Sequence, residues 1–275
     1  MKYADYIKEI EIDALWGGRK HIKWTLDPQV NILSGVNGDG KSTILRRAIT
    51  GAKTINAIEK QGIRLVTEPS DAEYIRYNWI CTPDVRSEYD ENLQGLVEKY
   101  NGNARKDDLK ALSDVAPAGN SKGLGSIKRV SEANVNGFRE TPEHQRSARQ
   151  GDKERRALLY DIIDKLFSAT HKTVDREKKE FTLLFYGEPI DLKVLSSGEK
   201  QMLTILLAVY LENEEPYVLF MDEPEVSLHV EWQKQLISII RKMNPNVQII
   251  LSTHSPAMIM DGWMDKVTEV SEITV

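Results

Sequence analysis

The hydrophobic and polar positions at the start of the chain predict β-structure. Strand-like stretches run from Ile7 to Leu15, from His21 to Leu26 and from Val30 to Leu33. Gly17-Gly18 and Asp27-Pro28 separate them, and both pairs are typical of turns. We therefore expect a β-rich unit that leads directly into the glycine-rich segment at residues 35–42.

Later stretches alternate between strands and helices, which indicates an α/β fold. The runs Tyr217–Met221 and Val247–Leu251 are continuously apolar, as expected of strands buried on both faces of a parallel sheet. The helix predicted over Met202–Leu211 is apolar nearly all round and should be buried. Further strands are predicted over 62–66, 74–81, 181–185 and 190–192, and further helices over 92–100 and 152–170.

A change in amino-acid composition divides the chain into three parts. From about residue 82 to 151 the sequence is polar and rich in Gly, Asn, Ser, Lys and Arg, with one short helical pattern. We expect residues 1–81 to form the N-terminal part of a core, 82–151 an insertion or arm, and 152–275 the rest of the core.

Composition narrows the classes of function. The net charge of −5 excludes a generally basic nucleic-acid coat, although it leaves room for a local basic face. The single cysteine, Cys81, excludes an intramolecular disulfide and suggests a reducing compartment. The N-terminus lacks the apolar stretch of a signal peptide, and the longest apolar run is too short to span a bilayer. We expect a cytoplasmic protein without membrane contact.

The most specific signal is the match of residues 35–42 to the phosphate-binding loop G-x-x-x-x-G-K-[ST]. Backbone N–H groups converge on a triphosphate only where side chains do not obstruct them, which explains the glycines. Lys41 is expected to contact the β and γ phosphates, and Ser42 to offer its hydroxyl to Mg²⁺. Asp39 is unusual in a loop built for anions, so we expect its side chain to point outward. The predicted nucleotide-binding residues are Gly35, Asn37, Gly38, Asp39, Gly40, Lys41, Ser42 and Thr43.

A second phosphate-binding surface is predicted at the start of the buried helix. Ser196, Ser197, Gly198 and Glu199 precede Met202, and a serine beside a helix N-terminus suits an anion. The S-x-x-E spacing of Ser196 and Glu199 also fits a capping box, and both interpretations can hold together.

Polar side chains follow the two apolar strands. Asp222 and Glu223 end the first strand, where a parallel sheet binds its ligands. We expect Asp222 to hold Mg²⁺ through water and Glu223 to polarise the attacking water. His254 follows the second strand. A lone histidine is more often structural, but here we expect it to bond the γ-phosphate and orient that water.

Together the four motifs resemble the ABC-type ATPase family, in its soluble SMC, RecF, OLD and Septu-like branch. The segment 195–201 reads LSSGEKQ, and 222–229 resembles the DEPE-x-x-LH pattern of that branch. The resemblance implies an ABC-ATPase head: an α/β P-loop fold with a mixed central sheet, an antiparallel β subdomain and a helical or irregular insertion. It also implies a homodimer that sandwiches two ATP molecules between the phosphate loop of one chain and Ser196 and Gly198 of the other.

Other features of the family do not map onto this sequence. No glutamine directly follows the strand ending at Cys81, and the nearest one downstream is Gln94. Both Trp16 and the loop 17–20 are candidates for the group that stacks on adenine.

Basic residues slightly outnumber acidic ones between Arg139 and Arg156. We interpret this segment as a solvated surface; contact with DNA or RNA, or with a protein partner, is the alternative.

The leading functional hypothesis is an ATPase, with ATP and Mg²⁺ as cofactors, that gates a separately encoded effector such as a nuclease. Bacterial anti-phage defence or DNA processing would be its setting. The alternatives are a DNA-repair clamp of the RecF or SMC type and, less favoured, the nucleotide-binding subunit of a transporter.

Overall fold

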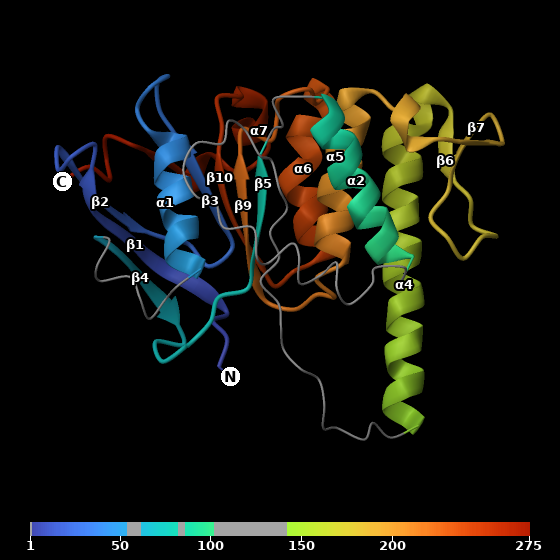
Figure 1. Cartoon of the computed structure of the whole chain (residues 1–275), viewed down its shortest axis with the longest axis horizontal. Coiled ribbons are helices and arrows are strands. Elements are labelled where there is room, and N and C mark those ends of the chain that lie inside the picture. Colours follow the sequence, from blue (N-terminus) through green and yellow to red (C-terminus); the bar gives the residue numbers. More distant parts are fainter. Residues whose placement is uncertain (1, 54–61, 82–85, 102–141) are drawn as a thin grey trace.

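The computed structural model describes residues 2–53, 62–81, 86–101 and 142–275 (Figure 1). Its central sheet has five strands in the order β11-β3-β10-β9-β5, all parallel among the described residues. The strands are β3 (Val30–Ser34), β5 (Tyr77–Cys81), β9 (Tyr217–Asp222), β10 (Val247–Ser252) and β11 (Val267–Glu269). The α/β class is confirmed, but the expected mixed character of this sheet is wrong. Helices pack on both faces of this sheet, as is usual for parallel strands, whose crossover connections place helices there.

A second, antiparallel sheet confirms the predicted β subdomain. It has the order β2-β1-β4, from β1 (Tyr6–Leu15), β2 (Lys20–Thr25) and β4 (Ile63–Glu68). Its apolar face packs with helix α1 (Lys41–Lys53) and one face of the central sheet into a single buried cluster. Gln248 joins the two sheets, since its fully buried amide bonds both the N–H and the carbonyl of Ile7, each at 2.8 Å.

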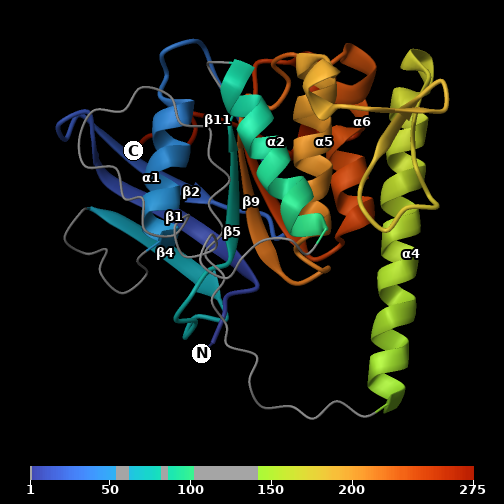
Figure 2. The same ribbon diagram turned by 45° about the vertical axis from the view of Figure 1, so that its right-hand side comes forward.

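Helices cover the other face of the central sheet (Figure 2). They are α2 (Arg86–Tyr100), α4 (Pro142–Phe167), α5 (Ser197–Tyr210) and α6 (Val230–Met243). The N-terminal part of α4 projects beyond the other helices. As predicted, α5 is buried on nearly every side. Short α7 (Pro256–Met260) follows β10.

A small sheet lies near the start of α5, with the order β6-β7-β8. Its strands are β6 (Lys172–Val174), β7 (Leu183–Phe185) and β8 (Glu188–Ile190), and the 3₁₀ turns η2 (Ser168–Thr170) and η3 (Leu192–Val194) flank it. The strand expected over 190–192 is β8, which lies earlier, at Glu188–Ile190, because a 3₁₀ turn begins at Leu192. A further turn, η4 (Met264–Lys266), precedes β11.

The predicted insertion is only partly described. Residues 86–101 include α2, which extends the short helix expected at 92–100, and residues 142–151 belong to α4. The remaining stretches, 82–85 and 102–141, lie outside the described residues. The division of the chain at 81/82 and 151/152 stays a prediction.

Candidate nucleotide-binding site

The phosphate loop connects the end of β3 to the start of α1. Gly38 and Gly40 have φ values of 88° and 94°, in the region that favours glycine, so the backbone can turn without strain. Helix α1 begins at Lys41, and the Ile44 N–H already donates to the Gly40 carbonyl at 2.8 Å. The first N–H groups of α1 therefore face the loop, where a helix favours an anion.

Two charged side chains of the loop contact its own backbone. The buried Lys41 donates from Nζ to the carbonyls of Gly35 at 2.9 Å and Val36 at 3.0 Å. The Asp39 carboxylate accepts from the Val36 N–H at 3.2 Å. Asp39 thus bonds its own loop and is not among the residues that line the cavity described below.

Strand β9 supplies a carboxylate to the first turn of α1. Asp222 Oδ1 accepts from Ser42 Oγ at 2.9 Å and from Ser252 Oγ at 2.5 Å. Ser252 ends β10 and lies opposite Asp222 in the sheet register. A hydroxyl and a carboxylate this close form the oxygen set that Mg²⁺ shares with a substrate phosphate. The residues present therefore fit Mg²⁺, and Ser42 and Asp222 are the residues that would hold it.

Glu223 and His254 face each other beyond the ends of β9 and β10. His254 Nε2 lies 3.4 Å from Glu223 Oε1, and both side chains are partly exposed. Glu223 adopts φ 50°, which is uncommon for a residue with a side chain, and its N–H donates to the Ser252 carbonyl at 3.1 Å. The backbone turns sharply at Glu223, as happens where a functional side chain must be aimed.

These groups meet at one cavity of about 720 Å³. Its lining comes from the loop after β1, the phosphate loop with the start of α1, and the ends of β9 and β10. The lining residues are Trp16, Asn37, Gly38, Gly40, Lys41, Ser42, Thr43, Glu223 and His254. A cavity at the carboxyl ends of parallel strands is where an open α/β sheet binds its ligand.

Trp16 and the loop 17–20 were the two candidates for stacking on the adenine base. Of these, Trp16 lines the cavity. A Cβ added to Gly40 would lie 2.5 Å from the Trp16 ring, so the indole packs directly on the phosphate loop. Lys20 Nζ lies 5.0 Å from the ring centroid. Trp16 precedes Gly17-Gly18, so its sequence neighbours indicated a turn but not where the ring would point.

The four predicted residues at the start of α5 are not among those lining this cavity in the described part of the chain. The capping box is present: Ser196 Oγ accepts from the Glu199 N–H at 3.2 Å, and Glu199 Oε2 accepts from the Ser196 N–H at 2.9 Å. Gly198 packs against the Ser227 carbonyl so closely that a Cβ there would overlap it. One chain therefore holds the two predicted phosphate-binding surfaces apart.

A buried ion pair orients the start of α5. Lys172 Nζ on β6 lies 2.8 Å from Glu199 Oε1, and the Thr170 hydroxyl donates to the same oxygen at 2.8 Å. Burial by itself would raise the pKa of Glu199. The Lys172 ammonium and the donors of Ser196 and Thr170 outweigh burial, so this pKa lies below its ordinary value.

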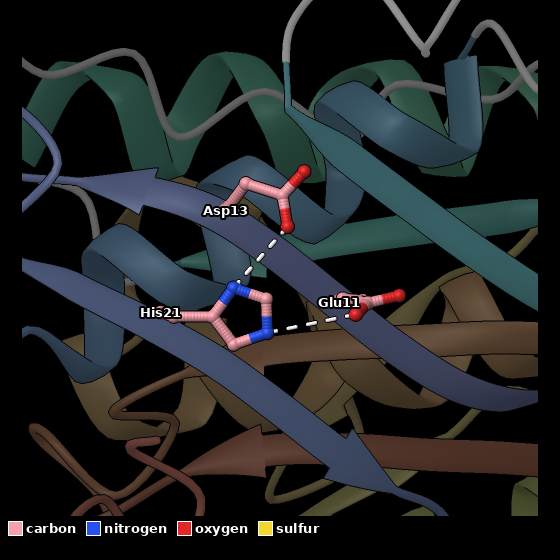
Figure 3. A group of neighbouring side chains, drawn as sticks. All are labelled: Glu11, Asp13 and His21. Atoms are coloured by element: carbon pink, nitrogen blue, oxygen red, sulfur yellow. Dashed lines mark ion pairs between the residues drawn. The ribbon is translucent and has the colours of Figure 1, made fainter.

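Glu11, Asp13 and His21 gather on the antiparallel sheet, away from the cavity lining (Figure 3). His21 Nδ1 lies 3.2 Å from Asp13, whereas Nε2 lies 3.5 Å from Glu11. The Arg64 guanidinium is also 3.5 Å from Glu11. The two ring nitrogens therefore face different carboxylates, and one of these carboxylates already lies beside the Arg64 guanidinium.

The remaining expectations concern the basic residues, the nearest downstream glutamine and contact with a membrane. Of the basic residues between Arg139 and Arg156, Arg155 is used in packing, since it donates to the Tyr210 carbonyl and to Asn213 Oδ1, both at 2.9 Å. The side chains of Arg139, Arg146 and Arg149 lie outside the described residues. Gln94 lies on α2 and donates to Glu98. No helix in the described ranges is long and apolar enough to cross a membrane.

The parallel sheet, the phosphate loop and the polar strand ends define an ABC-like ATPase head. The family described as "AAA domain, putative AbiEii toxin, Type IV TA system" (AAA_21) matches residues 124–261, half of the chain. The chain belongs to this family.

Similar proteins agree with that assignment. "Septu protein PtuA" of Bacillus thuringiensis is 24% identical over 92% of this chain and 72% of its own length. "Retron Vc95 probable ATPase" of Vibrio cholerae serotype O1 biovar El Tor is 29% identical over 34% of this chain, a match that spans 20% of that protein. The crystal structure of an SmcHead bound to the C-winged helix domain of ScpA superposes with a TM-score of 0.51 at 15% identity, covering 93% of this chain and 91% of the other. That likeness shows the fold.

Proposed function

We propose that this protein binds ATP with Mg²⁺, hydrolyses it, and uses ATP-dependent homodimerisation to gate a separately encoded effector. The observation that carries the proposal is the convergence of Ser42, Glu223 and His254 on one cavity beside the phosphate loop, with the buried Asp222 accepting a hydrogen bond from Ser42 just behind its lining. The proposed catalytic residues are Glu223, which activates water, and His254, which orients it. Bound Mg²⁺ would neutralise charge on the phosphates.

The dimer follows from the separation of the two phosphate-binding surfaces within one chain. Because Ser196 and Gly198 do not line the cavity formed around Lys41, we propose that they reach the triphosphate of a second copy. Two helix N-termini would then neutralise one triphosphate from opposite sides. Hydrolysis splits off the γ-phosphate, and its release would remove the bridge between the two copies.

The biological setting is proposed from the relatives. A retron ATPase and a Septu protein support a role in bacterial anti-phage defence, with a cytoplasmic location and an effector such as a nuclease encoded separately. Affinity purification of the tagged chain from its native host, with and without ATP, would identify this effector. Salt-sensitive duplex binding by the purified chain alone would instead favour a DNA clamp.

Two variants test the ATPase proposal. Glu223→Gln should retain ATP and accumulate as a dimer, measured by light scattering with ATP and Mg²⁺, whereas Glu91→Gln, an exposed change on α2, should behave as wild type. Lys41→Ala should abolish ATP binding in calorimetry, while Arg47→Ala on the exposed side of α1 should not. A Glu223→Gln protein that stays monomeric with ATP would refute the sandwich.

A further inference from the structure

Glu225, which follows Glu223 and Pro224, connects the turn after β9 to the turn after β10. Glu225 Oε1 accepts from the Thr253 hydroxyl and from the His254 N–H, both at 2.7 Å. Thr253 is buried, and its own oxygen accepts from the Ser255 N–H at 2.9 Å. One carboxylate oxygen therefore fixes the backbone at the point where His254 leaves the sheet.

A glutamine strengthens the same junction from α6. Gln233 Nε2 donates to the Leu228 carbonyl at 2.8 Å and to the Glu225 carbonyl at 3.4 Å. Its Oε1 accepts from the Ser255 hydroxyl at 2.6 Å. The turn that carries Glu223 and Glu225 is thus joined through side chains to the turn that carries His254.

Strand pairing cannot provide this alignment. The register of β9 and β10 ends at Asp222 and Ser252. In the described part of the chain, the Glu223 N–H bonds the Ser252 carbonyl and the Thr253 N–H bonds the Leu33 carbonyl of β3, but the His254 N–H bonds the Glu225 side chain. Beyond that point, side-chain hydrogen bonds must set how His254 faces Glu223. The other oxygen of Glu225, Oε2, is buried and accepts no hydrogen bond within the described part of the chain.

We propose that Glu225 is a positioning residue: it holds the His254 backbone so that the imidazole faces Glu223 across the cavity. This inference rests on the proposed ATPase function. It identifies the Glu225 carboxylate as the group that aligns the proposed catalytic side chains of Glu223 and His254. Because Glu225 does not line the cavity, removing its carboxylate should leave ATP binding intact and slow the chemical step.

Kinetics of Glu225→Ala, Glu225→Gln and Glu231→Ala test the proposal. Glu225→Ala should lower kcat about 10–100-fold, the range for a small misplacement of a catalytic group, with the Kd for ATP within about 2-fold of wild type. Glu225→Gln keeps the accepting oxygen and should restore most of kcat. Glu231→Ala removes an exposed carboxylate on α6 and should match wild type. An unchanged kcat in Glu225→Ala overturns the proposal.

A spectroscopic measurement separates this inference from the ATPase proposal. The chain has five histidines, so comparison with His254→Gln assigns the imidazole signals of His254 in heteronuclear NMR spectra. Those signals should shift in Glu225→Ala and return towards wild type in Glu225→Gln. Unshifted His254 signals refute the positioning role, whether or not the protein hydrolyses ATP. A wild-type protein without ATPase activity would refute only the proposed function.

If Glu225→Ala does not fold, Glu225→Asp takes its place in both measurements. The shorter side chain keeps the charge but withdraws the oxygen from the Thr253 hydroxyl and the His254 N–H. We expect the same shift of the His254 signals and a loss of kcat between those of Glu225→Gln and Glu225→Ala. Wild-type signals and kcat in this variant would also overturn the proposal.

Discussion

Replacing Lys172 by methionine tests how the start of α5 is held. The side chains of Lys172 and Glu199 are only 13% and 4% exposed, and their charged atoms lie 2.8 Å apart. Methionine keeps much of the volume but leaves the buried carboxylate without its cation. Removing one partner of a buried ion pair costs about 3–5 kcal/mol. Glu199 keeps the donors of Ser196 and Thr170, so we expect a loss near the lower end, about 3 kcal/mol.

Thermal and urea unfolding at pH 7 measure this loss. A change of about 3 kcal/mol corresponds to a decrease in Tm of about 6–12 °C for a chain of this size. Lys178→Met is the control, because Lys178 pairs with Asp175 at 3.8 Å on the surface, and its loss should cost less than about 1 kcal/mol.

A double variant tests whether the loss of stability comes from the buried charge of Glu199. In Lys172→Met with Glu199→Gln the buried charge is gone, and glutamine still completes the capping box with Ser196. The double variant should therefore be more stable than Lys172→Met alone. A cost below about 1 kcal/mol for Lys172→Met, or simple addition of the two single costs, would contradict the buried-pair account.

Three further outcomes follow from the structure. Gln248→Leu should destabilise the protein by about 2–4 kcal/mol in urea unfolding, because the Ile7 N–H and carbonyl lose their buried partners. Gly198→Ala should impair ATP-dependent dimerisation in light scattering, with ATP binding retained, because its Cβ displaces the Ser227 carbonyl. Glu199 has a lower pKa in the folded protein than in the unfolded chain, where it is about 4.3. The ionised carboxylate therefore stabilises the folded state fully above the unfolded pKa, and this stabilisation is lost as the pH falls through the lower, folded pKa. Glu199→Gln should flatten the decline of stability below about pH 5, measured by urea unfolding across pH.

The local pattern of the sequence was sufficient for most of the core. The continuous apolar runs predicted β9 and β10, and the all-round apolar pattern predicted the buried helix α5. Both signals are local, since they depend on whether neighbouring side chains are buried. The two apolar runs also indicated parallel strands, but the sheet as a whole was expected to be mixed, whereas its described strands are all parallel; strand direction depends on how distant segments pair.

The candidate site divides in the same way. The phosphate loop, the carboxylates of Asp222 and Glu223, and His254 could be named from the sequence, because each follows a recognisable strand at fixed spacing. Ser252 was missed as a partner of Asp222, although it is the polar residue that ends β10. Its role depends on the register between β9 and β10, which no local pattern encodes.

By itself the sequence determined which chemical groups stand at the strand ends and in the glycine-rich turn, because these groups are fixed by covalent order and local conformation. Only the tertiary structure decided that Trp16 packs on Gly40, that Lys172 pairs with Glu199, and that Glu225 bonds the His254 backbone. Each of these contacts joins residues more than 20 positions apart. Such contacts form only when packing of the sheets and helices brings distant segments within hydrogen-bond or van der Waals distance.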